Sequence, residues 1–187
     1  MRQLGAALGV DPTSVYHYLS GKSELYDLLM DAVIDEGDLA AVDPRLGVDE
    51  LLLTVGRELR RVLLRHPHVV PLFATRSFRT PAQLRPIERI VPALEAKGFS
   101  AAEIMTTMNV VGTYAIALTN VELLHRAQAR PEGDYLPTEE TLATLPHLQR
   151  LFADPGAYAG IDAEFEAGLC ALVAGLLARQ RIGALLP

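Results

Sequence analysis

Apolar residues recur every three or four positions along most of this chain, a pattern that predicts one helix after another. In the segment 48–65, for example, Leu52, Val55, Leu59 and Val62 fall on one side of a helix. Further helices are predicted over 2–8, 12–19, 23–36, a short segment ending near 75, 81–97, 100–127, 138–153 and 162–180. Because no segment alternates with the two-residue period of a strand, the sequence predicts an all-α fold.

Capping residues mark several of these helix boundaries. Thr80 and Gln83 stand three residues apart around a proline, and Ser100 and Glu103 repeat that spacing, so both pairs predict capping boxes. Gly98 is expected to end the helix before Ser100. The polar segment 37–47 carries no helical pattern, and it divides the chain into predicted domains 1–46 and 47–187.

The first two dozen residues have the pattern of a helix-turn-helix. Gly9 is expected to end the first helix, Asp11 to cap the second and Pro12 to occupy its first position. The second helix carries polar side chains suited to the base edges and phosphates of a major groove. They are Thr13, Ser14, Tyr16, His17 and Tyr18.

Three segments, in this order, resemble the TetR family of transcriptional regulators with a tetracycline-repressor-like C-terminal domain. They are LGAALGVDPTSVYHYLSGKSELYDLL, KGFSAAEIMTTMNVVGTYAIA and DAEFEAGLCALVAGLLARQ. The resemblance implies an N-terminal DNA-binding domain followed by a helical domain for effector binding and dimerisation. It also implies a repressor that releases palindromic double-stranded operator DNA when a small hydrophobic effector binds.

The same resemblance implies which residues touch DNA. Base contacts are expected from Arg2, Pro12, Thr13 and Tyr16, and phosphate contacts from Ser14, His17, Tyr18 and Lys22. Lys22 begins the next predicted helix, where its charge and the free N–H groups would meet one phosphate.

Family members normally carry another helix before this motif, whereas Met1 here leads directly into it. Two explanations remain open. The native chain begins upstream with that first helix, or the protein is a ligand-binding and dimerisation protein that no longer grips DNA. The first is favoured because the recognition helix keeps its polar residues.

Composition adds limits to this interpretation. The net charge of −6 argues against nonspecific nucleic-acid binding over the whole surface. The charge is unevenly distributed, however. Residues 24–43 hold seven acids and no base, whereas the first 22 residues hold two cations and one anion. No apolar run reaches the roughly 18 residues of a membrane span. With a single cysteine, Cys170, and no leader pattern, we expect a cytoplasmic protein without membrane contact.

The last helix indicates a homodimer. Large apolar residues at 165, 169, 172 and 176 form one stripe, and a second stripe consists of the small residues Ala167, Ala171, Ala174 and Ala178. A helix that is apolar all round is covered on two sides, and the partner subunit is the expected second cover. The other reading places this helix and 100–127 at the centre of a monomeric bundle.

An effector cavity is expected among helices 48–65, 81–97 and 100–127. Its predicted lining is Leu59, Phe73, Phe78, Val91, Met105, Met108, Asn109, Thr113 and Phe152. Asn109 is the expected polar anchor, although each of these residues can also be read as ordinary core. Phe73 stands where the tetracycline repressor has a metal-binding histidine, so neither a metal nor another cofactor is expected.

Candidates for catalysis are weak. Glu122 and His125 have the spacing of a di-iron ligand pair, but such sites need a second pair that the sequence lacks. His66 and His68 flank a proline without a third ligand at zinc spacing. No phosphate-binding glycine loop or nucleophile elbow is present, so an enzyme is not expected. Four arginines on helix 48–65, including Arg60, are expected to form a solvated face.

Overall fold

The computed structural model describes residues 2–9, 11, 17–37, 43, 46–127, 137–154, 156 and 160–183. Within these ranges all regular structure is helical, as the sequence predicts. The helices are α1 (Arg2–Leu8), α3 (Lys22–Asp35), α4 (Val48–Arg65), α5 (Val70–Thr75), α6 (Pro81–Ala96), α7 (Ala101–Ala127), α8 (Glu139–Ala143), α9 (Pro146–Phe152) and α10 (Ile161–Gly183).

Local chemistry sets most of these boundaries. The capping box before α6 is complete, because Thr80 Oγ1 accepts from the N–H of Gln83 and the Gln83 side chain accepts from the N–H of Thr80. Ser100 and Glu103 form the same arrangement before α7. Gly9 and Gly98 adopt φ of 68° and 83°, the left-handed conformation that ends a helix at low energetic cost in glycine.

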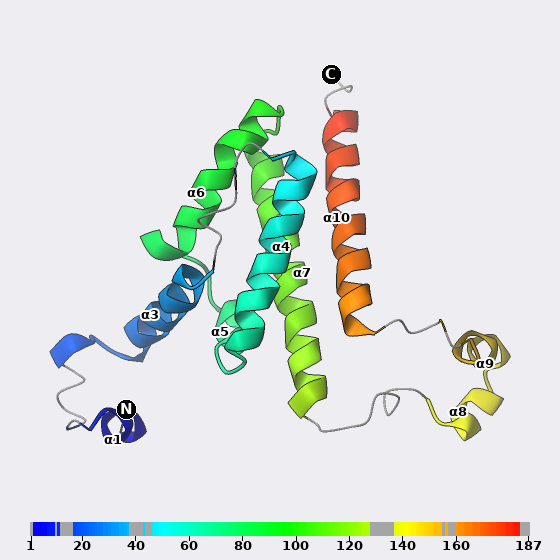
Figure 1. Cartoon of the computed structure of the whole chain (residues 1–187), viewed down its shortest axis with the longest axis horizontal. Helices are drawn as coiled ribbons and strands as arrows, with labels where there is room; N and C mark the ends of the chain where they lie inside the picture. Colours follow the sequence, from blue (N-terminus) through cyan, green and yellow to red (C-terminus); the bar gives the residue numbers. More distant parts are fainter. Residues whose placement is uncertain are drawn as a thin grey trace.

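The long helices α4 and α7 lie side by side in the middle of the molecule, with α6 on one flank and α10 on the other (Figure 1). Leu52 and Leu63 of α4, Val111 of α7 and Leu169 of α10 are fully or almost fully buried between them. The N-terminal helix α1 stands apart from the bundle formed by α4, α6, α7 and α10 (Figure 1).

Helix α3 belongs to this same core despite lying before the predicted domain boundary. Met30, Val33 and Ile34 in its C-terminal half are at most 5% exposed and join the apolar cluster of the larger bundle. Leu28 and Leu29, at the middle of α3, are exposed by contrast. One face of α3 therefore lies in the core while another faces outward.

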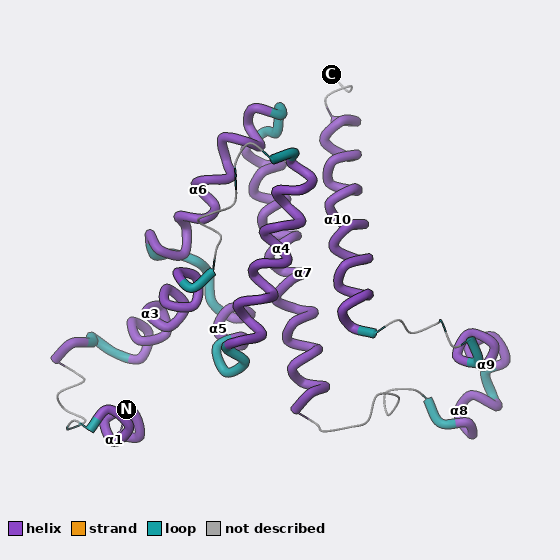
Figure 2. The backbone as a smooth tube through the Cα atoms, in the orientation of Figure 1, coloured by secondary structure: helices purple, strands orange, loops and turns teal. Residues whose placement is uncertain are grey.

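Two predicted boundaries are wrong. The helix expected over 138–153 is two short helices, α8 and α9, because Pro146 has no N–H and restricts the residue before it. Helix α10 begins at Ile161, so Asp162 lies in its first turn and is not its cap. The α8–α9 pair projects away from the bundle (Figure 2) and exposes Leu145, Leu148 and Leu151.

Candidate functional site

An apolar cavity of about 70 Å³, which we call the inner cavity, lies between α3, α4, α6 and α7. Its lining residues are Ile34, Val55, Leu59, Phe78, Gln83, Pro86, Ile87, Ile90, Met108, Val111 and Gly112. Gln83 is the sole polar side chain among them. Because a cavity of about 150 Å³ admits benzene, the inner cavity in this state is about half the size needed for one aromatic ring.

The inner cavity includes some of the residues that the sequence analysis assigned to it. Leu59, Phe78 and Met108 line it. Phe73 is buried in the adjoining core, where its ring packs edge-on against Phe78 at 5.7 Å between centroids, and Val91 packs against the same core. Their proximity to the cavity does not by itself test ligand binding.

Three other predicted lining residues point elsewhere. Met105, Asn109 and Thr113 are exposed on the outer face of α7, with Met105 59% exposed. They are spaced by four residues and therefore share one helix face, whereas Met108 is rotated by about 100° from Asn109. The expectation that Asn109 anchors a ligand inside this subunit's cavity is wrong. Phe152 lies in α9, away from the bundle, and does not line the inner cavity.

The polar wall of the inner cavity is bonded to α3. Gln83 is 1% exposed, and its Nε2 donates to Asp31 Oδ1 at 2.7 Å and to the Asp27 carbonyl at 3.3 Å. Its Oε1 accepts from the N–H groups of Arg79 and Thr80. With both donors and the acceptor engaged, Gln83 is held as a fixed link between the cavity and α3.

Ionic contacts reinforce this link. Asp27 accepts hydrogen bonds from Arg79 and from Arg76, the latter at 2.8 Å, and both guanidinium groups also reach Ser23 Oγ at 2.9 Å. The hydrogen bonds from Arg79 and Arg76 lower the pKa of Asp27. We call the set Asp27, Asp31, Arg76, Arg79, Thr80 and Gln83 the α3 clamp. Thr80 completes it with a 2.6 Å hydrogen bond to Asp31.

A second ion-paired cluster ties the central helices together and takes Arg60 out of the solvated face predicted for α4, on which the other three arginines are exposed. Arg60 has a side chain only 14% exposed, donates to the buried Glu122 at 2.7 Å and stacks over the Phe165 ring at 4.7 Å. Asp162 and Arg126 extend the cluster. Glu122 therefore has a structural role, and within the described ranges no three His, Cys, Asp or Glu side chains come together as a metal-binding group.

Residues 43–180 match a family model described as "Tetracyclin repressor-like, C-terminal domain". An HTH-type transcriptional regulator of Saccharopolyspora erythraea is 34% identical over 186 residues, covering 95% of this chain and 75% of that protein. The tetracycline repressor protein class A from transposon 1721 of Escherichia coli is 27% identical, covering 97% of this chain and 82% of that protein. The crystal structure of the Streptomyces coelicolor TetR family protein ActR in complex with actinorhodin has a TM-score of 0.76 at 26% identity, covering 96% and 87% of the two chains.

The chain belongs to the TetR family of transcriptional regulators. Its relatives are regulators of transcription and not enzymes. Among the described helices of this TetR-family chain, none is long and apolar enough to cross a membrane.

The structure describes part of the predicted DNA-contacting set of this TetR-family regulator. Tyr18 is 85% exposed, and His17 and Lys22 are also exposed. Lys22 is the first residue of α3, directly after a turn in which the N–H and Oγ of Ser20 donate to Glu24 at 2.6 and 2.7 Å. Arg2 belongs to α1, whereas Pro12, Thr13, Ser14 and Tyr16 lie outside the described residues. The roles of all eight remain predictions.

The outer faces of α7 and α10 carry the residues expected at a subunit interface. Ala167, Ala171, Ala174 and Ala178 are all exposed in the single chain, and Val121 and Leu124 of α7 are 39% and 51% exposed. Phe165 and Leu169 on the other stripe of α10 are fully buried. The two stripes thus separate as the sequence predicts, and the dimer itself remains a prediction.

Sequence reasoning missed several residues that matter for the inner cavity. Val111 belongs to the inward stripe of α7 that also contains Met108, so the helical period alone could have placed it there. The same period places Asn109 outside this stripe, although its polarity suggests a ligand anchor. The second role of Gln83 had no local signal, because its partner Asp31 lies 52 residues away in the sequence.

Proposed function

We propose that this TetR-family chain is a homodimeric repressor that releases palindromic operator DNA when a small hydrophobic effector enters the inner cavity. One observation carries the proposal: Gln83 is a wall of the inner cavity and a hydrogen-bond donor to Asp31 of α3. Helix α3 begins four residues after Tyr18, the last described residue of the proposed recognition helix. A displacement of the cavity wall therefore has a direct mechanical path toward the DNA-contacting end.

The size of the inner cavity supports a linked change of shape. At about 70 Å³ it is smaller than most effectors would need, so binding requires α6 to move away from α4 and α7. Helix α6 has internal prolines at 86 and 92, which remove two helical hydrogen bonds and make it easier to bend. Movement of its first turn pulls on the α3 clamp.

The consequence for DNA follows from geometry. In a symmetric dimer the two recognition helices enter half-sites about 34–36 Å apart, or a multiple of that spacing. Rotation of α3 in each subunit changes the distance between them, and the effector then weakens operator binding by favouring the mismatched spacing. Exposed Lys22 at the start of α3, together with His17 and Tyr18, is placed to hold phosphates.

The names of relatives fit this proposal. The Escherichia coli relative is a tetracycline repressor, and ActR was crystallised with actinorhodin, a small-molecule ligand. We propose for this chain the same class of activity without adopting either ligand. The small, uncharged stripe on α10 supplies the proposed dimer contact.

Selection from a library of random double-stranded DNA, followed by fluorescence anisotropy, tests the proposal. We expect enrichment of a palindrome, binding that weakens steeply with salt, and release by at least one compound from a hydrophobic panel. If the full chain enriches no sequence and binds DNA without salt dependence, the protein is a ligand-binding dimer without operator binding. If it binds a palindrome that no compound releases, the effector part of the proposal is wrong.

A further inference from the structure

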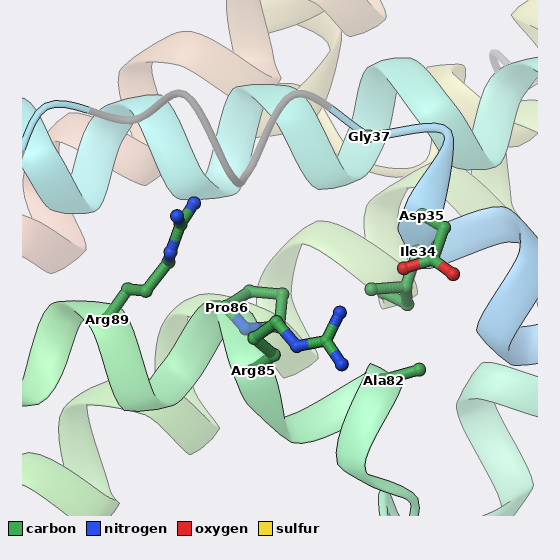
Figure 3. A pocket seen from close by; sticks show the side chains of 7 residues that line it. All are labelled: Ile34, Asp35, Gly37, Ala82, Arg85, Pro86 and Arg89. Atoms are coloured by element: carbon green, nitrogen blue, oxygen red, sulfur yellow. The ribbon is translucent and has the colours of Figure 1, made fainter.

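A second cavity of about 70 Å³, which we call the outer cavity, opens at the surface between the end of α3 and α6 (Figure 3). Its lining is Ile34, Asp35, Gly37, Ala82, Arg85, Pro86 and Arg89. Ile34 and Pro86 also line the inner cavity, so the two spaces adjoin at these two apolar side chains. A shift of either side chain would join them.

Pro86 lines both cavities and interrupts the hydrogen bonds of α6. A proline inside a helix has no N–H, and its ring crowds the carbonyl four residues earlier. The carbonyl of Ala82 therefore lacks its usual helical donor, and Ala82 lines the outer cavity. Helix α6 gives the inner cavity mostly apolar side chains, with Gln83 the exception, and gives the outer cavity Arg85 and Arg89.

The outer cavity carries more positive than negative charge. Arg85 and Arg89 are four residues apart on α6 and so share one helix face, and both are exposed. Asp35 lies across from Arg85 (Figure 3) and contributes the one acidic side chain of the lining. Guanidinium groups bind carboxylates through paired hydrogen bonds, whereas a dianionic phosphate would be repelled more strongly by Asp35.

We propose that the two cavities form one amphiphilic site that takes a monocarboxylic acid, its apolar chain in the inner cavity and its carboxylate beside Arg85 in the outer cavity. The inference rests on the proposed function, because it names the chemical class of that effector. Each cavity alone is too small for an aromatic ring, so a narrow chain that passes between Ile34 and Pro86 fits the shape.

Isothermal titration calorimetry of the full chain with octanoate and with octanamide tests this assignment, because the two probes share a chain and differ in charge. We expect octanoate to bind about tenfold more tightly, a difference of about 1.4 kcal/mol. Arg85→Gln should abolish the preference for the acid, with a smaller change in octanamide affinity than in octanoate affinity. Lys97→Gln removes an exposed charge at the other end of α6 and should keep the preference.

A second variant changes the affinity in the opposite direction. Asp35→Asn removes the acidic group from the outer cavity and should increase octanoate affinity about two- to threefold, with no such gain for octanamide. Arg85 and Asp35 are both exposed, so neither variant should alter the unfolding temperature substantially.

The assignment is overturned if octanoate does not bind, if acid and amide bind alike, or if Arg85→Gln keeps the preference. These calorimetric results do not depend on DNA. If only uncharged compounds release the operator, the repressor function is supported and the acid as effector is refuted. If the protein binds the acid but no operator, the acid site is supported and the repressor function is refuted.

Discussion

The Nε2 atom of Gln83 lies 2.7 Å from Oδ1 of Asp31, which joins the wall of the inner cavity to α3 by one partly buried hydrogen bond. Both side chains have further partners, so the bond is part of a connected set and not an isolated contact. Polar networks of this kind have few alternative arrangements, because any displacement leaves a buried group unsatisfied. The contact is therefore well suited to transmit a change in cavity shape.

Replacing Gln83 with Leu should separate effector binding from DNA release. The variant keeps an apolar wall but leaves Asp31 with one donor fewer, and we expect a loss of about 1–3 kcal/mol in the free energy of unfolding. The affinity for operator DNA in the absence of effector should be unchanged, whereas release of the DNA should need a several-fold higher effector concentration. Urea unfolding and anisotropy titrations measure the two effects. Gln149→Leu on the exposed surface of α9 is the matched control, and equal effector response in both variants would contradict the coupling role.

Asp27 should make the protein sensitive to acid. Its pKa is lowered by hydrogen bonds from Arg79 and Arg76, so the charged form stabilises the fold. This contribution is present above the ordinary aspartate pKa of about 3.9 and is lost as the pH falls through the lower value in the folded state. Asp27→Asn should therefore be less stable than the wild type at pH 7, with the difference shrinking toward pH 3. Unfolding curves over this range measure it, and a constant difference would contradict the assignment.

Lys22 should contribute to DNA binding through its charge alone. Lys22→Ala is expected to weaken binding by a similar factor for every operator sequence and to lower the slope of log affinity against log salt by about one. Lys97→Ala, another exposed lysine far from α1, serves as control. Unchanged affinity and slope in Lys22→Ala would remove the phosphate contact from the proposal.

A charge on the small-residue stripe of α10 should separate the subunits. Ala174→Glu places a carboxylate where the proposed interface excludes water, and an unpaired buried charge costs several kcal/mol. We expect sedimentation to show a monomer with intact helical content. Ala96→Glu, on an exposed position of α6, should stay dimeric. A well-folded Ala174→Glu dimer would place the interface elsewhere.

Gly168 should not tolerate even a methyl group. A Cβ at this position would overlap the hydroxyl of Tyr114, which donates to the carbonyls of Glu164 and Phe165 at 3.1 and 3.2 Å. Gly168→Ala therefore displaces the ring or breaks these bonds, with an expected loss of about 1–3 kcal/mol. Thermal unfolding measures the loss. Gly175→Ala, where nothing lies within 4 Å, should be neutral or stabilising in the monomer, and equal effects in both variants would contradict this account.

Features of the fold that depend only on residues close together in the sequence, such as the caps of α6 and α7, were predicted correctly. The pairs Thr80–Gln83 and Ser100–Glu103 cap their helices as predicted, because capping depends on residues within one turn. The break before Pro146 was also readable from the sequence, since the residue preceding a proline avoids the helical conformation. The apolar period alone runs on through Pro146 and so predicts a single helix there.

The site was less predictable because its key contacts are non-local. Arg60 has the pattern of a solvated residue, yet it meets Glu122, which is 62 residues away, in a pocket closed by Phe165. The polarity of Asn109 suggests a ligand anchor, whereas its position on the helix decides which way its side chain faces. The outer cavity depends on the distance between α3 and α6, which cannot be read from periodicity.

The burial of Met30, Val33 and Ile34 has a practical consequence for engineered regulators. These side chains of α3 share one core with α4 and α6, so a graft that imports all of α3 from a relative would disturb the packing of the bundle. A chimera that exchanges DNA specificity should therefore place its junction within the first two turns of α3, before Asp27. Such a junction keeps the α3 clamp from one parent, and with it the parent's response to effector.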